Sequence, residues 1–280
     1  MPTVTDLIGP AGRLDAILDE PFGSHARSGQ APAIRAAVVF AHPHPQYGGT
    51  MHTKAVFQGA KGLVRIGCAV LRFNFRGVGR SAGTFDLGDG EKRGRNGAGD
   101  EAPAQWRPPV GVQGAPTIQE RSGRNGAGDE APAQWRPPVG VQGAPTILKD
   151  DFRSALDYMA ARYPGVKLWA AGFSFGAWVA LEVGADDDRV SVLIGIAPPV
   201  ATSLSGHEYT FERTLASRKA KFFVQGEDDE VCPLAGLRAF YARLEEPREL
   251  AIIDSADHLF EGKTQEVGEA LEDLLKDYEG

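Results

Sequence analysis

The chain has 280 residues, 42% of them hydrophobic and 24% charged, which suits one large globular domain with a sizeable core. Its formal net charge of −7 disfavours nucleic acid as a partner, because an acidic surface repels phosphate backbones. The two cysteines form neither a disulfide framework nor a metal-binding spacing, and no signal peptide or 18-residue apolar stretch is visible, so we expect a cytoplasmic protein without a membrane span.

Short apolar segments alternate with amphipathic ones along most of the chain. This alternation predicts an α/β fold: a mostly parallel, doubly wound sheet with right-handed crossovers and helices on both faces. The first 30 residues are punctuated by glycine and proline, and they are expected to supply one or two antiparallel edge strands. The predicted strands are residues 36–41, 69–75, 166–173, 190–196, 221–225 and 250–253, and the predicted helices are residues 55–66, 150–163, 177–183, 234–244 and 264–278.

A perfect duplication interrupts this pattern, since residues 94–118 recur letter for letter as residues 123–147. The unit contains five Gly and four Pro in 25 residues and has no apolar periodicity, which predicts a flexible loop. Solenoid repeats are degenerate and carry a helix or strand that stacks, so this is not one of them. A recent tandem duplication or an engineered insertion would explain it.

Residues 172–176 read GFSFG and match the pattern G-x-S-x-G. Between a strand and a helix, this pattern forms a sharp turn that lifts the serine hydroxyl above the sheet edge. An apolar strand is predicted before it and a helix after it, which favours this interpretation over a glycine-rich packing turn. Ser174 is therefore the candidate nucleophile.

An acidic turn and a histidine follow two later strands, in the order that a serine, acid and histidine triad requires in this context. The acidic turn, residues 227–230, leaves the choice between Asp228 and Asp229 open, and a merely solvated loop is its alternative interpretation. His258 follows the last strand and is the candidate base, with a structural histidine as the alternative. A neutral imidazole would accept the serine proton, and a carboxylate on its other nitrogen would hold the tautomer.

Two backbone N–H groups are candidate donors to a tetrahedral oxyanion. One belongs to Phe175, the residue after the candidate nucleophile. The other is expected from the loop after residues 36–41, where Pro43 and Pro45 lack an N–H and only His44 between them can donate. A structural turn is the alternative interpretation of this loop.

Six segments, in order along nearly the whole chain outside the duplication, resemble lidless, dienelactone-hydrolase-like bacterial serine esterases of the α/β-hydrolase superfamily. The resemblance implies an α/β-hydrolase fold with a minimal cap and an open pocket. It places the acid three residues after the glycine of a G-x-x-D-x-x-x-P turn, which selects Asp229, and it matches His258 to the family histidine. The segments are AHPHPQYGGTMHTK, LRFNFRGVGRSAGTFDLGDGE, AGFSFGAW, IAPP, GEDDEVCP and ADHLF.

The resemblance further implies a single domain over residues 1–280, interrupted by an insertion at residues 92–149 that consists of two 29-residue units. Two interpretations of this insertion are a flap over the pocket, with Trp106 and Trp135 as apolar contacts, and an inert disordered loop. Dienelactone hydrolases have a cysteine where this chain has Ser174, which favours ester hydrolysis.

The sequence thus predicts a serine esterase that acts on small carboxylic esters through an acyl-enzyme, without a metal or organic cofactor. Thioester or amide hydrolysis by the same residues is an alternative, because the leaving group depends on the shape of the pocket. A non-catalytic binding protein of this fold is a second alternative. The small-molecule ester is the expected partner, nucleic acid and membrane are not, and a homodimer is left open.

Overall fold

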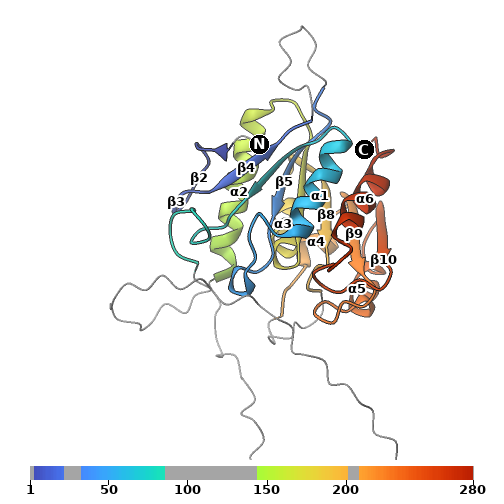
Figure 1. Ribbon diagram of the computed structural model, residues 1–280. Helices are drawn as coiled ribbons and strands as arrows, with labels where there is room; N and C mark the ends of the chain where they lie inside the picture. Colours follow the sequence, from blue (N-terminus) through green and yellow to red (C-terminus); the bar gives the residue numbers. More distant parts are fainter. Residues whose placement is uncertain (1–2, 22–32, 86–143, 201–207, 280) are drawn as a thin grey trace, which may run out of the picture.

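The computed structural model describes residues 3–21, 33–85, 144–200 and 208–279, and an eight-stranded sheet forms its centre (Figure 1). In spatial order the strands are β1 (Thr3–Val4), β4 (Ala16–Asp19), β6 (Ala69–Phe73), β5 (Ala37–Ala41), β7 (Leu168–Phe173), β8 (Val190–Ile196), β9 (Ala220–Gly226) and β10 (Arg248–Ile253). From β6 to β10 neighbouring strands are parallel, whereas β1 and β4 are antiparallel. The predicted parallel sheet and its antiparallel N-terminal edge are both present. A separate hairpin joins β2 (Ile8–Gly9) to β3 (Gly12–Arg13).

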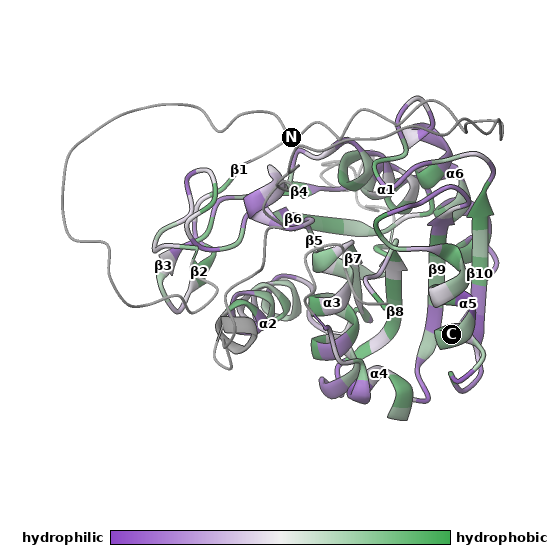
Figure 2. Ribbon diagram, turned by 90° about the horizontal axis from the view of Figure 1, so that it is seen from below, coloured by the Kyte–Doolittle hydropathy of each residue, from purple (hydrophilic) through white to green (hydrophobic). Residues whose placement is uncertain are grey.

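Helices cover both faces of the sheet (Figure 2). On one face, α1 (Lys54–Arg65) packs against α6 (Thr264–Leu275). The other face carries α2 (Ala144–Arg162), α3 (Phe175–Asp186) and α5 (Leu234–Tyr241). Two short elements were not expected, the helix α4 (Glu212–Ala216), which packs on α3, and a 3₁₀ turn (Pro45–Tyr47), because neither is long enough to show a periodicity.

The central strands are buried along their whole length, since every residue of β5, β6 and β7 is buried. Strands covered on both faces appear in a sequence as continuous apolar runs, which is why they could be found. The charged exception is Arg72 in β6, whose Nε donates to Asp19 at 2.6 Å and whose Nη1 donates to the carbonyl of Met51 at 2.8 Å. Pairing satisfies this buried guanidinium.

Helix α2 begins at Ala144, six residues before the predicted start at Asp150. The prediction took residues 92–149 as one flexible insertion, and this was wrong for its last residues. Leu148 is fully buried and lies on the same helix face as Phe152, and the Lys149 ammonium lies 4.5 Å from the centre of the Trp178 ring. These contacts extend the helix, while residues 92–143 lie outside the described part of the chain.

The carboxyl ends of the central strands meet at one edge of the sheet. Ala41 at the end of β5 pairs with Phe73 at the end of β6 and with Gly172 near the end of β7. The loops that follow these strands therefore lie side by side, where parallel sheets bind their ligands. Among the described residues, no helix is both long and apolar enough to cross a membrane.

Candidate active site

Ser174 lies in the sharp turn between β7 and α3, with φ 54° and ψ −121°. A positive φ is uncommon for a residue other than glycine, and such strain persists only where the surroundings hold it. The Ser174 N–H donates to the carbonyl of Ile196 on the neighbouring strand at 2.8 Å, and its carbonyl accepts from Ala177 at 2.9 Å. Both sides of the turn are thus fixed, and the serine is held at the carboxyl edge of the sheet.

The two glycines that flank Ser174 allow a close backbone approach. A Cβ on Gly172 would lie less than 3 Å from the carbonyl oxygen of Gly176. A Cβ on Gly176 would lie equally close to the carbonyl oxygens of Ala41 and His42 at the end of β5. The G-x-S-x-G spacing therefore has a steric cause, since only glycine lets α3 begin this close to β5.

Three side chains predicted from the sequence form one chain of hydrogen bonds. The Nε2 atom of His258 lies 3.0 Å from the Ser174 Oγ, and its Nδ1 lies 2.8 Å from the Asp229 Oδ2. Asp229 is 4% exposed, whereas the Asp228 side chain is exposed. The structure thus brings Asp229 to the histidine, the choice that the resemblance favoured.

Asp229 is held by three donors besides His258. Its Oδ1 accepts from the N–H groups of Val231 at 2.9 Å and Cys232 at 2.7 Å. Its Oδ2 also accepts from the Gln225 Nε2 at 2.9 Å, and this amide donates to the Cys232 carbonyl at 2.8 Å as well. The sequence analysis missed Gln225, although a polar residue near the end of a mostly apolar strand was a signal.

This arrangement fixes the tautomer of His258. An ionised Asp229 only accepts hydrogen bonds, so the His258 Nδ1 carries the proton between them. The Nε2 is then left with its lone pair toward the Ser174 hydroxyl, which donates to it. The group can therefore move a proton from Ser174 to His258 without any rearrangement of heavy atoms.

The loop after β5 lies against the start of α3, so the two candidate oxyanion donors come from adjacent segments. The ring centres of His44 and Phe175 are 5.0 Å apart in an edge-to-face arrangement. Phe175 is the first residue of α3, and the N–H groups of a first helical turn have no intrahelical acceptor. The positions of both residues are compatible with the predicted donor role.

His42 anchors this loop from inside the protein. Its Nδ1 lies 2.7 Å from the Pro43 carbonyl, and its Nε2 lies 3.2 Å from the N–H of Phe75, which follows β6. Burial lowers the pKa of His42 to about 4, so the ring is neutral near pH 7. Nδ1 then donates and Nε2 accepts, which ties the loop to the neighbouring segment.

Known proteins resemble the chain along almost its whole length, although no family model matches it. An uncharacterised protein of Rickettsia prowazekii is 28% identical over 273 residues, which cover 95% of this chain and 86% of that protein. An α/β serine hydrolase homologue from Coxiella burnetii is 27% identical and has a TM-score of 0.66, with 98% of this chain and 97% of that chain covered. An α/β serine hydrolase without a lid, from Xanthomonas campestris, is also 27% identical, with a TM-score of 0.64 and coverage of 97% and 92%.

The chain belongs to the α/β-hydrolase superfamily. The α/β-hydrolase fold inferred from the six sequence segments is thereby confirmed, and so is the assignment of the chain as a hydrolase of this fold.

One group of side chains at the candidate site has the residue types of a metal site. Ligand atoms of Asp229, Cys232 and His258 lie within 4.8 Å of one another. However, both carboxylate oxygens of Asp229 already accept hydrogen bonds, and burial raises the pKa of the Cys232 thiol, which keeps it protonated. Metal binding requires deprotonated ligands, so these residues fit a hydrogen-bonded group better than a metal site.

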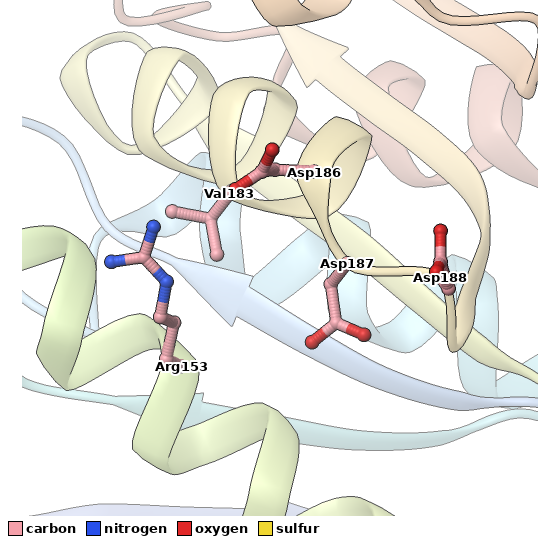
Figure 3. A pocket seen from close by; sticks show the side chains of 5 residues that line it. All are labelled: Arg153, Val183, Asp186, Asp187 and Asp188. Atoms are coloured by element: carbon pink, nitrogen blue, oxygen red, sulfur yellow. The ribbon is translucent and has the colours of Figure 1, made fainter.

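Two surface pockets of the hydrolase lie at the opposite edge of the sheet from Ser174. One, of about 350 Å³, is formed where α2 passes the end of α3, and Figure 3 shows the Arg153 side chain there together with three consecutive aspartates. The other, of about 460 Å³, lies around Trp169 at the amino end of β7. Neither pocket is lined by Ser174 or His258, so neither serves the candidate site.

Proposed function

We propose that this hydrolase cleaves small carboxylic esters through an acyl-enzyme formed on Ser174. The observation that carries the proposal is the chain of hydrogen bonds in which the His258 Nε2 lies 3.0 Å from the Ser174 Oγ and the His258 Nδ1 lies 2.8 Å from Asp229. Such a chain activates a hydroxyl that is otherwise a weak nucleophile at neutral pH.

The proposed reaction begins when the Ser174 Oγ attacks the ester carbonyl while the His258 Nε2 takes its proton. Asp229 then stabilises the imidazolium, and the N–H groups of Phe175 and His44 are the proposed donors to the oxyanion. The imidazolium gives its proton to the leaving alcohol, which leaves an acyl group on Ser174. A water molecule, deprotonated by His258, releases the acid and restores the serine.

Two other functions are compatible with the same residues. Thioester or amide hydrolysis would use the same proton path with another leaving group, and a panel of matched substrates separates these reactions. A non-catalytic binding protein is the alternative from a different class, and failure of Ser174 to react with a fluorophosphonate would favour it. The hydrogen-bonded, correctly ordered side chains support catalysis.

Hydrolysis of p-nitrophenyl acetate and butyrate by the wild type and by Ser174→Ala tests the proposal. Without the nucleophile the acyl-enzyme cannot form, so we expect kcat/KM to fall at least about 10³-fold. Circular dichroism and thermal unfolding of the variant serve as the folding control. Equal activity in a folded Ser174→Ala variant, or no activity in the wild type on any ester of the panel, would overturn the proposal.

A further inference from the structure

A cluster of rings surrounds Phe175, the residue after the candidate nucleophile. The ring centre of His44 lies 5.1 Å from that of Tyr47 and 5.6 Å from that of Phe85. On the other side of Phe175, Tyr209 lies 6.1 Å away. We call His44, Tyr47, Phe85 and Tyr209 the aromatic rim. Three separate segments contribute to it, from the loop after β5, the end of the described segment 33–85 and the segment before α4.

The buried ring of Trp178 packs against the rings of Phe175 and Tyr209. Trp178 on α3 is 3% exposed and lies 5.7 Å from Phe175 and 5.1 Å from Tyr209, measured between ring centres. Its indole N–H donates to the Thr210 carbonyl at 2.9 Å, which fixes the segment that carries Tyr209. The Tyr209 side of the rim is therefore held against α3, the helix that begins directly after Ser174.

Tyr209 lies near both loops that flank the candidate site. Burial raises the pKa of its hydroxyl, and Tyr47 and Cys232 add to this rise in pKa through their proximity. Tyr47 belongs to the loop after β5, and Cys232 belongs to the turn that holds Asp229. Tyr209 thus lies near both the loop after β5 and the turn that holds Asp229, and its ring packs against those of Phe175 and Trp178.

Tyr47 is open to solvent, with 52% of the residue exposed. Among the described residues, Tyr47 and Ile8 are the large hydrophobic side chains that are exposed to this degree. Tyr47 is the one that belongs to the loop after β5, where its ring contacts that of His44. Aromatic side chains with one free edge are suited to offset or edge-to-face contact with another ring. An aliphatic substrate group of the same volume would bury apolar surface there but would gain no ring–ring interaction.

We infer that the aromatic rim makes this hydrolase prefer esters with an aromatic ring next to the scissile ester group, over esters with a saturated ring of the same size. The inference rests on the proposed function of Ser174 and adds a substrate class to it. Aromatic pairs contribute interaction beyond their buried area that corresponds to a preference of roughly three- to tenfold.

Two pairs of substrates measure this preference. Ethyl phenylacetate and ethyl cyclohexylacetate have the same leaving alcohol, so they compare the rings on the acyl side. Benzyl acetate and cyclohexylmethyl acetate make the same comparison on the alcohol side. We expect the aromatic member of at least one pair to have the higher kcat/KM, by roughly three- to tenfold. Ratios near one, or below one, in both pairs would overturn the inference.

Variants of Tyr47 then connect the preference to the rim. Tyr47→Phe keeps the ring and should retain the ratio, whereas Tyr47→Leu keeps the apolar character without the ring and should bring it toward one. Ile8→Ala, at the other exposed hydrophobic residue and on the β2–β3 hairpin, is the matched control and should not change the ratio. A ratio that Tyr47→Leu leaves unchanged contradicts the assignment to this rim.

Binding of the same four esters to Ser174→Ala, measured by calorimetry, separates the two levels of the proposal. If p-nitrophenyl acetate is hydrolysed through Ser174 but the aromatic esters bind no better than the saturated ones, the inference fails and the proposed function stands. If the variant binds the aromatic esters more tightly while the wild type hydrolyses no ester, the rim stands and the proposed function fails. No binding preference and no hydrolysis would overturn both.

Discussion

Asp228 and Asp229 are neighbours in the chain but differ in their surroundings, and this difference allows a matched test. Asp229 is buried and bonded to His258, while the Asp228 side chain is exposed. In Asp229→Asn the amide could hold the imidazole in the wrong tautomer, so we expect kcat/KM for p-nitrophenyl acetate to fall by about 10⁴-fold. Asp228→Asn should change it by less than about twofold, since surface substitutions are nearly neutral.

Equal losses in these two variants would contradict the role proposed for Asp229. An activity assay alone does not separate loss of catalysis from loss of folding. Asp229 also accepts hydrogen bonds from the N–H groups of Val231 and Cys232, so the substitution affects the structure of this turn as well. The thermal midpoint of each variant is therefore the necessary control. An Asp229→Asn protein that stays folded and keeps wild-type kcat/KM would exclude the carboxylate from the reaction.

At this scale, the G-x-S-x-G motif and the order of segments along the chain were enough to propose Ser174, His258 and the acidic turn, because each follows a strand that could be identified from the sequence. The position of Asp229 within the turn needed the resemblance. Gln225 stands out in the sequence only as a polar residue near the end of a mostly apolar strand. Its hydrogen bond to Asp229 could not be predicted, because nothing in a short strand indicates that a side chain turns back onto a carboxylate four residues later. Contacts of this kind depend on the path of a loop, which has no periodicity.

Helix α2 is joined to the loop after β6 by a buried ion pair between Asp151 and Arg76. Asp151 is fully buried and accepts from the Arg76 N–H at 3.0 Å, its Nε at 3.0 Å and its Nη2 at 2.7 Å. We expect Asp151→Ala to lower the free energy of unfolding by about 3–5 kcal/mol, because it leaves a largely buried guanidinium without its carboxylate. Urea denaturation measures this loss.

Asp150 offers the matched control for Asp151. It pairs with Arg153 at 2.8 Å, but both side chains are more than 40% exposed. Solvent screens such a pair, so Asp150→Ala should cost no more than about 1 kcal/mol. If both variants unfold at the same urea concentration, the Arg76–Asp151 pair contributes no more to stability than the exposed Asp150–Arg153 pair.

Elements with long apolar patterns were predicted within a few residues of their observed bounds, and β8 was predicted at Val190–Ile196 as observed. The start of α2 was missed because Leu148 stands directly after a Gly/Pro-rich repeat, which hid the first residue of its apolar face. The residues between β4 and β5, and those before α4, are only partly described. The antiparallel edge strands predicted within the first 30 residues are β1 and β4, while the β2–β3 hairpin was not foreseen.

On the scale of the whole molecule, the fold assembles its candidate site from residues that are far apart in the chain. The loop after β5, the turn after β7 and the loops after β9 and β10 meet because the strands that precede them are parallel and in register. The hydrogen-bonded group of Ser174, His258 and Asp229 contains no residue of the insertion. The insertion can therefore be shortened by one or both of its units without removing any of these three residues.

Deleting residues 92–120 removes one 29-residue unit and leaves Leu148 in place. The Gly/Pro-rich composition predicts a flexible loop, and halving such a loop changes the closure cost by only about 0.6 kcal/mol. We expect kcat/KM and the free energy of unfolding to stay close to wild type. A loss of activity on p-nitrophenyl acetate would instead show that the segment contributes to the site.

Deleting residues 92–149 should behave differently, because it also removes Leu148, whose side chain is fully buried against the core. Gly90 would then occupy that position, two residues before Asp150. We expect the free energy of unfolding to fall by about 2–5 kcal/mol, the usual cost of removing a buried leucine side chain. Gly90→Leu within this deletion should restore most of the loss. If the longer deletion is as stable as the shorter one, the first turns of α2 contribute nothing to the fold.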